Sequence, residues 1–211
     1  MDYAAGLAQT QDDAFAGEEK RSAARYTSLI RSAKLITSQG EFICVIRDVS
    51  ATGISLRTFH ALPDTTGLKL ELQNGETYSL VATREGANEA SFRFAKPVVV
   101  ERLIREAWVF PKRQLRLNLA LPVTLSSLTG STDAVTINVS QQGARVECDS
   151  SFALDQPVRV SSDRFGEARA KVRWRKDTVH GLVFDNTFSL RELALLAAAV
   201  QCPALLKDSP R

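Results

Sequence analysis

The sequence has few residues of the types that usually carry catalysis or bind metals. Among its 211 residues there are two histidines, and neither has a nucleophile or a carboxylate pattern around it. The cysteines, Cys44, Cys148 and Cys202, are an odd number without the spacing of a metal site. We therefore expect no enzyme, no metal and no cofactor, and we interpret Cys44 and Cys148 as small buried thiols in strands.

The sequence also lacks a long apolar run and an N-terminal targeting signal. No run reaches the roughly 20 apolar residues that cross a bilayer, and the N-terminus has no basic start followed by an apolar stretch. We therefore expect a cytoplasmic protein without membrane insertion. The formal net charge of +3 is too small to indicate nucleic acid, and aromatic residues, the usual stacking platforms for single strands, make up only 7%. We expect no nucleic-acid partner. A small basic barrel that binds single-stranded nucleic acid is kept as a less favoured alternative.

The charges are distributed unevenly along the chain. The first nineteen residues contain acidic residues but no Lys or Arg, and we interpret them as a flexible acidic tail. Basic residues follow directly after this tail, and a second basic cluster comprises Lys112, Arg113 and Arg116. Clustered arginines favour anionic partners, although a solvated basic face is the alternative interpretation.

The chain repeats itself. An Asp-x-Ser-x-x-Gly segment at residues 48–53 has a counterpart, Asn-x-Ser-x-x-Gly, 90 residues later at 138–143. The same offset relates Phe94 to Phe184. A shared offset over so much of the chain predicts a duplicated domain.

Each copy predicts a small antiparallel β-barrel followed by a helix. Short β-forming runs separated by Gly, Asp and Pro turns are typical of such a barrel. Apolar residues at helical spacing follow at 98–108 and again at 189–200, where a capping sequence begins at Ser189. The predicted units are an acidic tail over 1–19, a first domain over 20–109, a second domain over 110–205 and a short tail over 206–211.

Two motifs occur in the first copy in a specific order. Arg21 and Arg25 are followed by Asp48, Ser50 and Gly53. Taken separately, the motifs could be a solvated basic arm and a side-chain-capped turn. Together they resemble the signature of the PilZ family, which is an Arg-x-x-x-Arg arm followed by Asp/Asn-x-Ser-x-x-Gly on a β-barrel.

The second copy resembles this signature less completely. The residues that match its turn motif are Asn138, Ser140 and Gly143. Arg116 matches the second arginine of the arm, whereas Lys112 replaces the first and Arg113 lies one place late. Because lysine loses the planar fork and stacking surface of arginine, we rank the first copy as the stronger candidate site.

The first copy differs from the second near its last hairpin. Arg84 occupies the place of Trp174, and Ser91 occupies the place of Gly181. We interpret Trp174 as barrel packing rather than as a platform for a ligand.

The PilZ resemblance implies a mainly β chain of two tandem six-stranded antiparallel barrels, each closed by a C-terminal helix. It also implies that the arm and turn residues of each copy bind cyclic di-GMP. Arginine can hold a phosphate or a guanine edge with two hydrogen bonds and can stack on a purine. The side chains of Asp48 and Asn138 suit the N–H groups of guanine.

The resemblance implies a receptor that changes conformation on ligand binding and regulates an unidentified protein partner. The outputs of the family are motility, exopolysaccharide synthesis and virulence. The alternative is a PilZ-like protein-interaction scaffold in which nucleotide binding is lost or confined to one barrel. The oligomeric state stays open, with a homodimer as one option.

Overall fold

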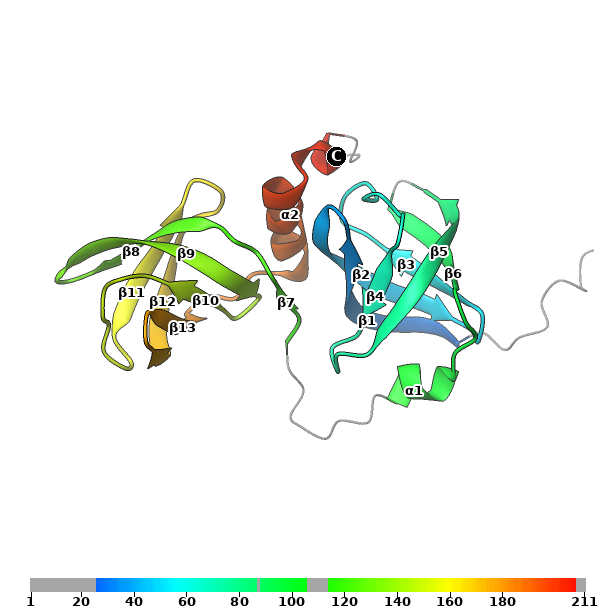
Figure 1. The fold of residues 1–211 in the computed structure, drawn as a ribbon, viewed down its shortest axis with the longest axis horizontal. Helices are drawn as coiled ribbons and strands as arrows, with labels where there is room; N and C mark the ends of the chain where they lie inside the picture. Colours follow the sequence, from blue (N-terminus) through cyan, green and yellow to red (C-terminus); the bar gives the residue numbers. More distant parts are fainter. Residues whose placement is uncertain (1–25, 87, 106–113, 208–211) are drawn as a thin grey trace, which may run out of the picture.

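The computed structural model describes residues 26–86, 88–105 and 114–207, and it is mainly β (Figure 1). The predicted acidic tail and the predicted domain boundary near residue 110 lie outside these described residues. Among the described helices, none has the length and apolar character to cross a membrane.

The first barrel is a closed antiparallel sheet with the strand order β1-β2-β3-β6-β5-β4. Its strands alternate between buried and more exposed residues, as in β3, where Ile54 and Leu56 point into the core. The elements are β1 (Tyr26–Thr37), β2 (Gly40–Val49), β3 (Gly53–Arg57), β4 (Lys69–Glu71), β5 (Thr77–Glu85), β6 (Glu89–Phe94) and the short helix α1 (Val100–Arg105).

The second barrel has the same topology. Its six strands follow the order β8-β9-β10-β13-β12-β11, and the β11–β8 pairing closes the ring. The additional strand β7 pairs with β9 outside this ring. The elements are β7 (Arg116–Leu117), β8 (Pro122–Ser127), β9 (Gly130–Ser140), β10 (Gly143–Glu147), β11 (Pro157–Ser162), β12 (Gly166–Lys176), β13 (Val179–Phe184), α2 (Leu190–Gln201) and the 3₁₀ helix η1 (Pro203–Leu206).

These two barrels confirm the predicted fold class and the six-strand count. The capping box predicted at Ser189 is present, because its side chain accepts a hydrogen bond from Glu192 N while the Glu192 carboxylate accepts one from Ser189 N. The helix predicted over 98–108 is described over Val100–Arg105, and the rest of that segment lies outside the described residues. Cys44 and Cys148 are buried thiols, as the sequence indicated.

Helix α2 lies between the two barrels (Figure 1). Leu193 and Ala197 pack in the core of the second barrel, whereas Ala198 packs in the core of the first. Two residues of β2, Ile43 and Val45, belong in turn to the apolar cluster of the second barrel. The barrels are therefore joined by a continuous apolar contact as well as by the chain between them.

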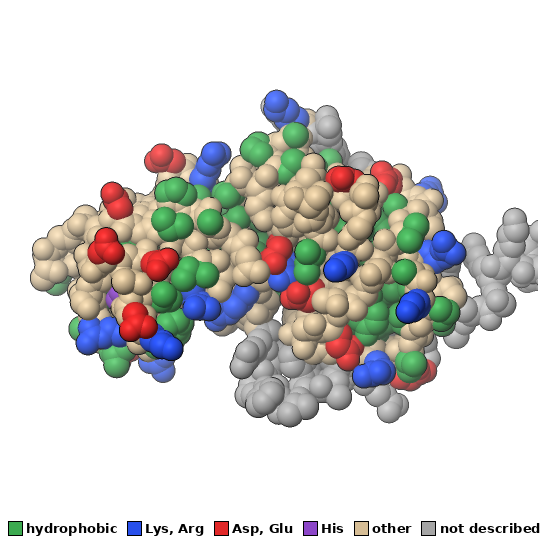
Figure 2. All heavy atoms as spheres, viewed as in Figure 1, with side chains coloured by type: hydrophobic (Ala, Val, Ile, Leu, Met, Phe, Trp, Pro, Cys, Tyr) green, Lys and Arg blue, Asp and Glu red, His purple; other side chains and the backbone are tan. Residues whose placement is uncertain are grey.

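Acidic and basic side chains are interspersed on the face of the molecule shown in Figure 2. Among the described residues on this face, neither sign of charge prevails. The charge on this face therefore does not by itself indicate a binding site.

Candidate functional site

The predicted site residues divide into two groups. Arg21, Arg25, Lys112 and Arg113 lie outside the described residues. The structure describes the other predicted residues, which are Asp48, Ser50, Gly53, Arg116, Asn138, Ser140 and Gly143.

Ser140 and Gly143 shape the connection between β9 and β10. The hydroxyl of Ser140 is buried and donates to the carbonyl oxygen of Gly143 at 3.0 Å. A Cβ atom on Gly143 would overlap the backbone carbonyl oxygen of Leu182 on β13. Both residues therefore allow two strands to approach closely and hold the tight turn.

The first barrel repeats this turn at Ser50 and Gly53. The Ser50 hydroxyl accepts from Gly53 N at 3.1 Å and lies 3.3 Å from the Gly53 carbonyl oxygen, while Ser50 N donates to that oxygen at 2.8 Å. A Cβ atom on Gly53 would lie 3.3 Å from the carbonyl oxygen of Phe92, which is tight but not overlapping. In both barrels, the Ser and Gly of the motif build the turn that presents the preceding Asp or Asn.

Asn138 belongs to a row of cross-strand neighbours on the second barrel. It pairs with Arg145 on β10, Arg145 pairs with Gly181 on β13, and Gly181 pairs with Trp174 on β12. Irregularities in the β9–β10 and β12–β13 pairings adjoin this row, and such bulges turn side chains to new directions. Since directly paired residues share a face of the sheet, these four residues lie together on the outer face of the barrel, where Asn138 is largely covered, with 8% of its surface exposed.

Trp174 and Arg145 form a stacked pair within this row. The Arg145 guanidinium lies 5.6 Å from the centroid of the Trp174 ring, a cation–π distance. A Cβ atom on Gly181 would overlap the indole, so glycine is required for the ring to lie on the strand. Trp174 is 40% exposed. The indole thus packs on the outer face of the barrel, against Gly181 and Arg145, and not in its core.

Arg145 was not predicted as a site residue. Its Nε is buried without a hydrogen-bond partner among the described residues, which is uncommon for a polar atom in a folded protein. The sequence contained a weak signal, because Arg145 follows Gly143 by two residues and so points to the same side of the strand. Its stacking on Trp174 depends on strand pairing and could not be read from spacing.

Arg116 lies beside this row. It is on β7, opposite Ser140 of β9, and its Nη1 donates to Oδ1 of Asn138 at 3.2 Å. The outer face therefore combines the guanidinium groups of Arg116 and Arg145, the amide of Asn138 and the exposed indole of Trp174. This set can bind a ligand that has both negative charge and flat rings.

Comparison with known proteins assigns this part of the chain to a family. The family described as PilZ domain matches residues 111–201. The second barrel is a PilZ domain. A search of curated protein sequences finds no match to the chain.

The PilZ domain and the barrel before it are together similar to several solved structures. PlzA of Borreliella burgdorferi in complex with c-di-GMP is 12% identical, with 82% of this chain and 88% of that chain covered and a TM-score of 0.34. MrkH of K. pneumonia in complex with c-di-GMP is 11% identical, with 84% and 96% covered and a TM-score of 0.32. YcgR of Escherichia coli in complex with c-di-GMP is 11% identical, with 83% and 85% covered and a TM-score of 0.32.

The first barrel differs from the PilZ domain at the corresponding face. Its row of cross-strand neighbours runs from Asp48 to Ser55, then to Ser91 and then to Arg84. Ser55 therefore occupies the position of Arg145 in the PilZ domain. Arg84 likewise occupies the position of Trp174. A pocket of about 310 Å³ lies here, lined by Asp48 and Ser50 among others. This barrel therefore has the turn motif and a cavity, but its row has no aromatic platform among the described residues.

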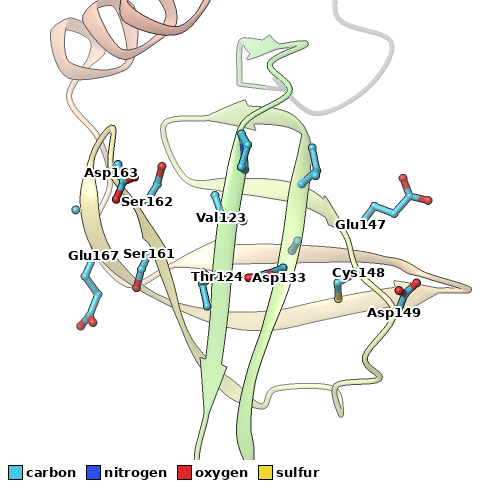
Figure 3. A pocket seen from close by; sticks show the side chains of 14 residues that line it. Val123, Thr124, Asp133, Glu147, Cys148, Asp149, Ser161, Ser162, Asp163 and Glu167 are labelled. Carbon is cyan, nitrogen blue, oxygen red and sulfur yellow. Dashed lines mark hydrogen bonds between the residues drawn. The ribbon is translucent and has the colours of Figure 1, made fainter.

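A larger pocket, of about 890 Å³, lies elsewhere on the PilZ domain (Figure 3). Carboxylates line much of it, from Asp133, Glu147, Asp149, Asp163 and Glu167. Burial raises the pKa of the neighbouring Cys148 thiol, which therefore stays protonated. Acidic walls repel an anionic ligand, so size alone does not make this pocket the candidate site. Within the described residues, no group of three or more His, Cys, Asp and Glu side chains could hold a metal ion.

Proposed function

We propose that the chain is a receptor for cyclic di-GMP and that its principal site is the outer face of the PilZ domain. The observation that carries this proposal is the row of Asn138, Arg145 and Trp174, with Arg116 hydrogen-bonded to Asn138. These side chains come from four different strands, and the fold brings them together on one surface.

The chemistry of this face complements cyclic di-GMP, which has two phosphates and two guanines. The indole of Trp174 offers a surface on which a guanine can stack. The guanidinium of Arg145 can donate to a phosphate or to a guanine acceptor. Asn138 uses Oδ1 to hold Arg116 and retains its amide N–H groups as donors to a guanine edge.

The arm before β7 completes the proposed site. Lys112 and Arg113 precede Arg116 by four and three residues, and we propose that they bind phosphate from that arm. Ser140 and Gly143 contribute through the turn that presents Asn138.

A second site is proposed on the first barrel, formed by Arg21, Arg25, Asp48, Ser50 and Gly53. The sequence motif ranks this site higher, because both arm arginines are present. The described side chains favour the PilZ domain instead, since Ser55 and Arg84 provide neither a stacked pair nor an indole. We therefore propose that the first barrel binds the ligand more weakly than the PilZ domain.

Regulation of a protein partner through a conformational change belongs to the same proposal. Hydrogen exchange at residues 20–26 and 110–117, with and without cyclic di-GMP, tests the conformational change. The absence of a stacked pair on the first barrel also favours the second candidate function, a PilZ-like scaffold in which nucleotide binding is confined to one barrel.

Calorimetry with cyclic di-GMP on the full chain tests the function and the ranking together. Removing a charged hydrogen-bonding partner costs about 1.5–3 kcal/mol, so Arg113→Ala/Arg116→Ala should weaken binding at least about tenfold. The Arg21→Ala/Arg25→Ala pair should have a smaller effect. Arg164→Ala is the control, because Arg164 is exposed in the turn between β11 and β12.

Three results of this titration would decide against parts of the proposal. A wild-type chain that does not bind cyclic di-GMP would refute the receptor function. A loss of binding only in the Arg21→Ala/Arg25→Ala pair would reverse the ranking of the two barrels. An equal loss in Arg164→Ala would show a nonspecific effect of charge.

A further inference from the structure

Glu41 connects the first barrel to both ends of the PilZ domain. Its carboxylate accepts hydrogen bonds from Asn118 N at 2.7 Å and Asn118 Nδ2 at 2.8 Å. Its backbone exchanges two hydrogen bonds with the side chain of Gln201 at the end of α2, one of 2.7 Å from Nε2 to Glu41 O and one of 2.9 Å from Glu41 N to Oε1. One residue of β2 thus contacts the segment that begins the PilZ domain and the helix that ends it.

Lys34 lies next to Glu41 and is buried, with 5% of its surface exposed. Its Nζ forms ion pairs with Glu41 at 3.1 Å and Glu71 at 3.0 Å, which offset the cost of burying the charge. The same Nζ donates a long hydrogen bond of 3.5 Å to the backbone carbonyl oxygen of Arg116. Lys34 therefore places a fixed positive charge against the backbone of β7.

These contacts act on a strand that has little support from its own sheet. The pairing of β7 with β9 involves only Arg116 and Leu117. Arg116 and Asn118 alternate with the buried Leu117 and Leu119, so they leave the chain on the same side. Contacts to the Arg116 carbonyl and to Asn118 thus set the direction in which the Arg116 side chain extends toward Asn138.

We propose that Glu41 and Lys34 are positioning residues for the cyclic di-GMP site of the PilZ domain. They hold β7 so that Arg116 meets Asn138 before the ligand arrives, which lowers the cost of ordering the site on binding. The first barrel thereby contributes to the affinity of the second without touching the ligand. This inference rests on the proposed function of the PilZ domain.

Glu41→Gln and Glu71→Gln form a matched pair for the test in the full chain. Each removes one carboxylate charge from Lys34, but only Glu41 contacts the PilZ domain. In calorimetry with cyclic di-GMP, Glu41→Gln should weaken binding by roughly five- to tenfold, as expected for lost pre-organisation. Glu71→Gln should stay within about twofold of wild type. Equal effects of the two variants would overturn the proposal.

The Arg116→Ala background separates positioning from a general structural effect. If Glu41 acts through Arg116, then adding Glu41→Gln to Arg116→Ala should cause no further loss of affinity. An undiminished effect of Glu41→Gln in that background would show that Glu41 does not act through Arg116. In the same way, Glu41→Gln and Asn118→Ala should be less than additive, because Asn118→Ala removes the Nδ2 hydrogen bond to the same carboxylate and leaves the backbone N–H bond in place.

Hydrogen exchange without ligand provides a readout that does not depend on the proposed function. Amides of residues 114–119 should exchange faster in Glu41→Gln than in wild type or Glu71→Gln. Unchanged exchange there would show that Glu41 does not hold β7. If wild type does not bind cyclic di-GMP, the proposed function fails and the role in affinity fails with it, whereas the exchange result still decides whether the contact exists.

Discussion

Gly181→Ala is expected to impair ligand binding although the substituted residue itself need not touch the ligand. The added Cβ would overlap the indole of Trp174, so the ring has to leave the surface of β13. Because Trp174 is 40% exposed, the ring can move into solvent and the barrel should remain folded. The movement separates Trp174 from Arg145 and removes the stacking platform.

The size of the effect follows from the value of a stacked base. Stacking of a base on an aromatic side chain is worth about 1–3 kcal/mol, which corresponds to a roughly 5- to 150-fold loss of affinity. Gly181→Ala should therefore weaken binding of cyclic di-GMP within this range. Trp174→Ala should do the same, while Trp174→Phe should retain part of the affinity, because phenylalanine keeps an aromatic face.

Calorimetry and indole fluorescence together make this test specific. The chain contains two tryptophans, Trp108 and Trp174, so a Trp108→Phe background leaves Trp174 as the sole indole. Ligand binding should change its emission, and Gly181→Ala should reduce that change. The double variant Gly181→Ala/Trp174→Ala should bind no more weakly than Trp174→Ala alone. Wild-type affinity in both Gly181→Ala and Trp174→Ala would refute the stacking platform.

Three further predictions follow from the geometry. Gly143→Ala should lower the free energy of unfolding by about 1–3 kcal/mol in urea titrations, because its Cβ would overlap the carbonyl oxygen of Leu182. Gly53→Ala should lower the free energy of unfolding by less, since its Cβ would not overlap a neighbour. Arg116→Ala should weaken cyclic di-GMP binding by about tenfold and make it less sensitive to salt, as titrations at two ionic strengths would show. Burial lowers the pKa of His60 below its ordinary value of 6.5. Below pH 6.5 the unfolded chain therefore binds a proton at His60 more readily than the folded chain does. The free energy of unfolding should consequently be unaffected by His60 above pH 6.5 and should fall as the pH decreases below 6.5.

Each of these predictions has a contrary outcome. Equal destabilisation by Gly143→Ala and Gly53→Ala would show that the approach of β13 to the turn is not the cause. An unchanged salt dependence in Arg116→Ala would show that the charge of Arg116 does not contribute to binding. A His60→Asn variant that loses as much stability below pH 6.5 as wild type would assign the acid sensitivity to other groups.

Local patterns in the sequence determined the fold class and the turn geometry. The offset between residues 48–53 and 138–143 predicted the duplication, and short β-forming runs between Gly, Asp and Pro turns predicted the strands of both barrels. Ser140 and Gly143 act within a few residues of one another, so their spacing alone contains the information. The capping box at Ser189 was predictable for the same reason.

The tertiary structure decided which side chains meet on the binding face. Trp174 stacks beside Arg145 only because the pairings of β10, β12 and β13 bring both to Gly181. The contact of Glu41 with Asn118 likewise joins residues 77 positions apart in the chain. Strand register and the packing of α2 between the barrels depend on the summed burial of many apolar residues. Because the burial of many distant residues cannot be read from the spacing of a few neighbouring ones, the binding face of the PilZ domain and the contact between the barrels could be found only in the folded chain.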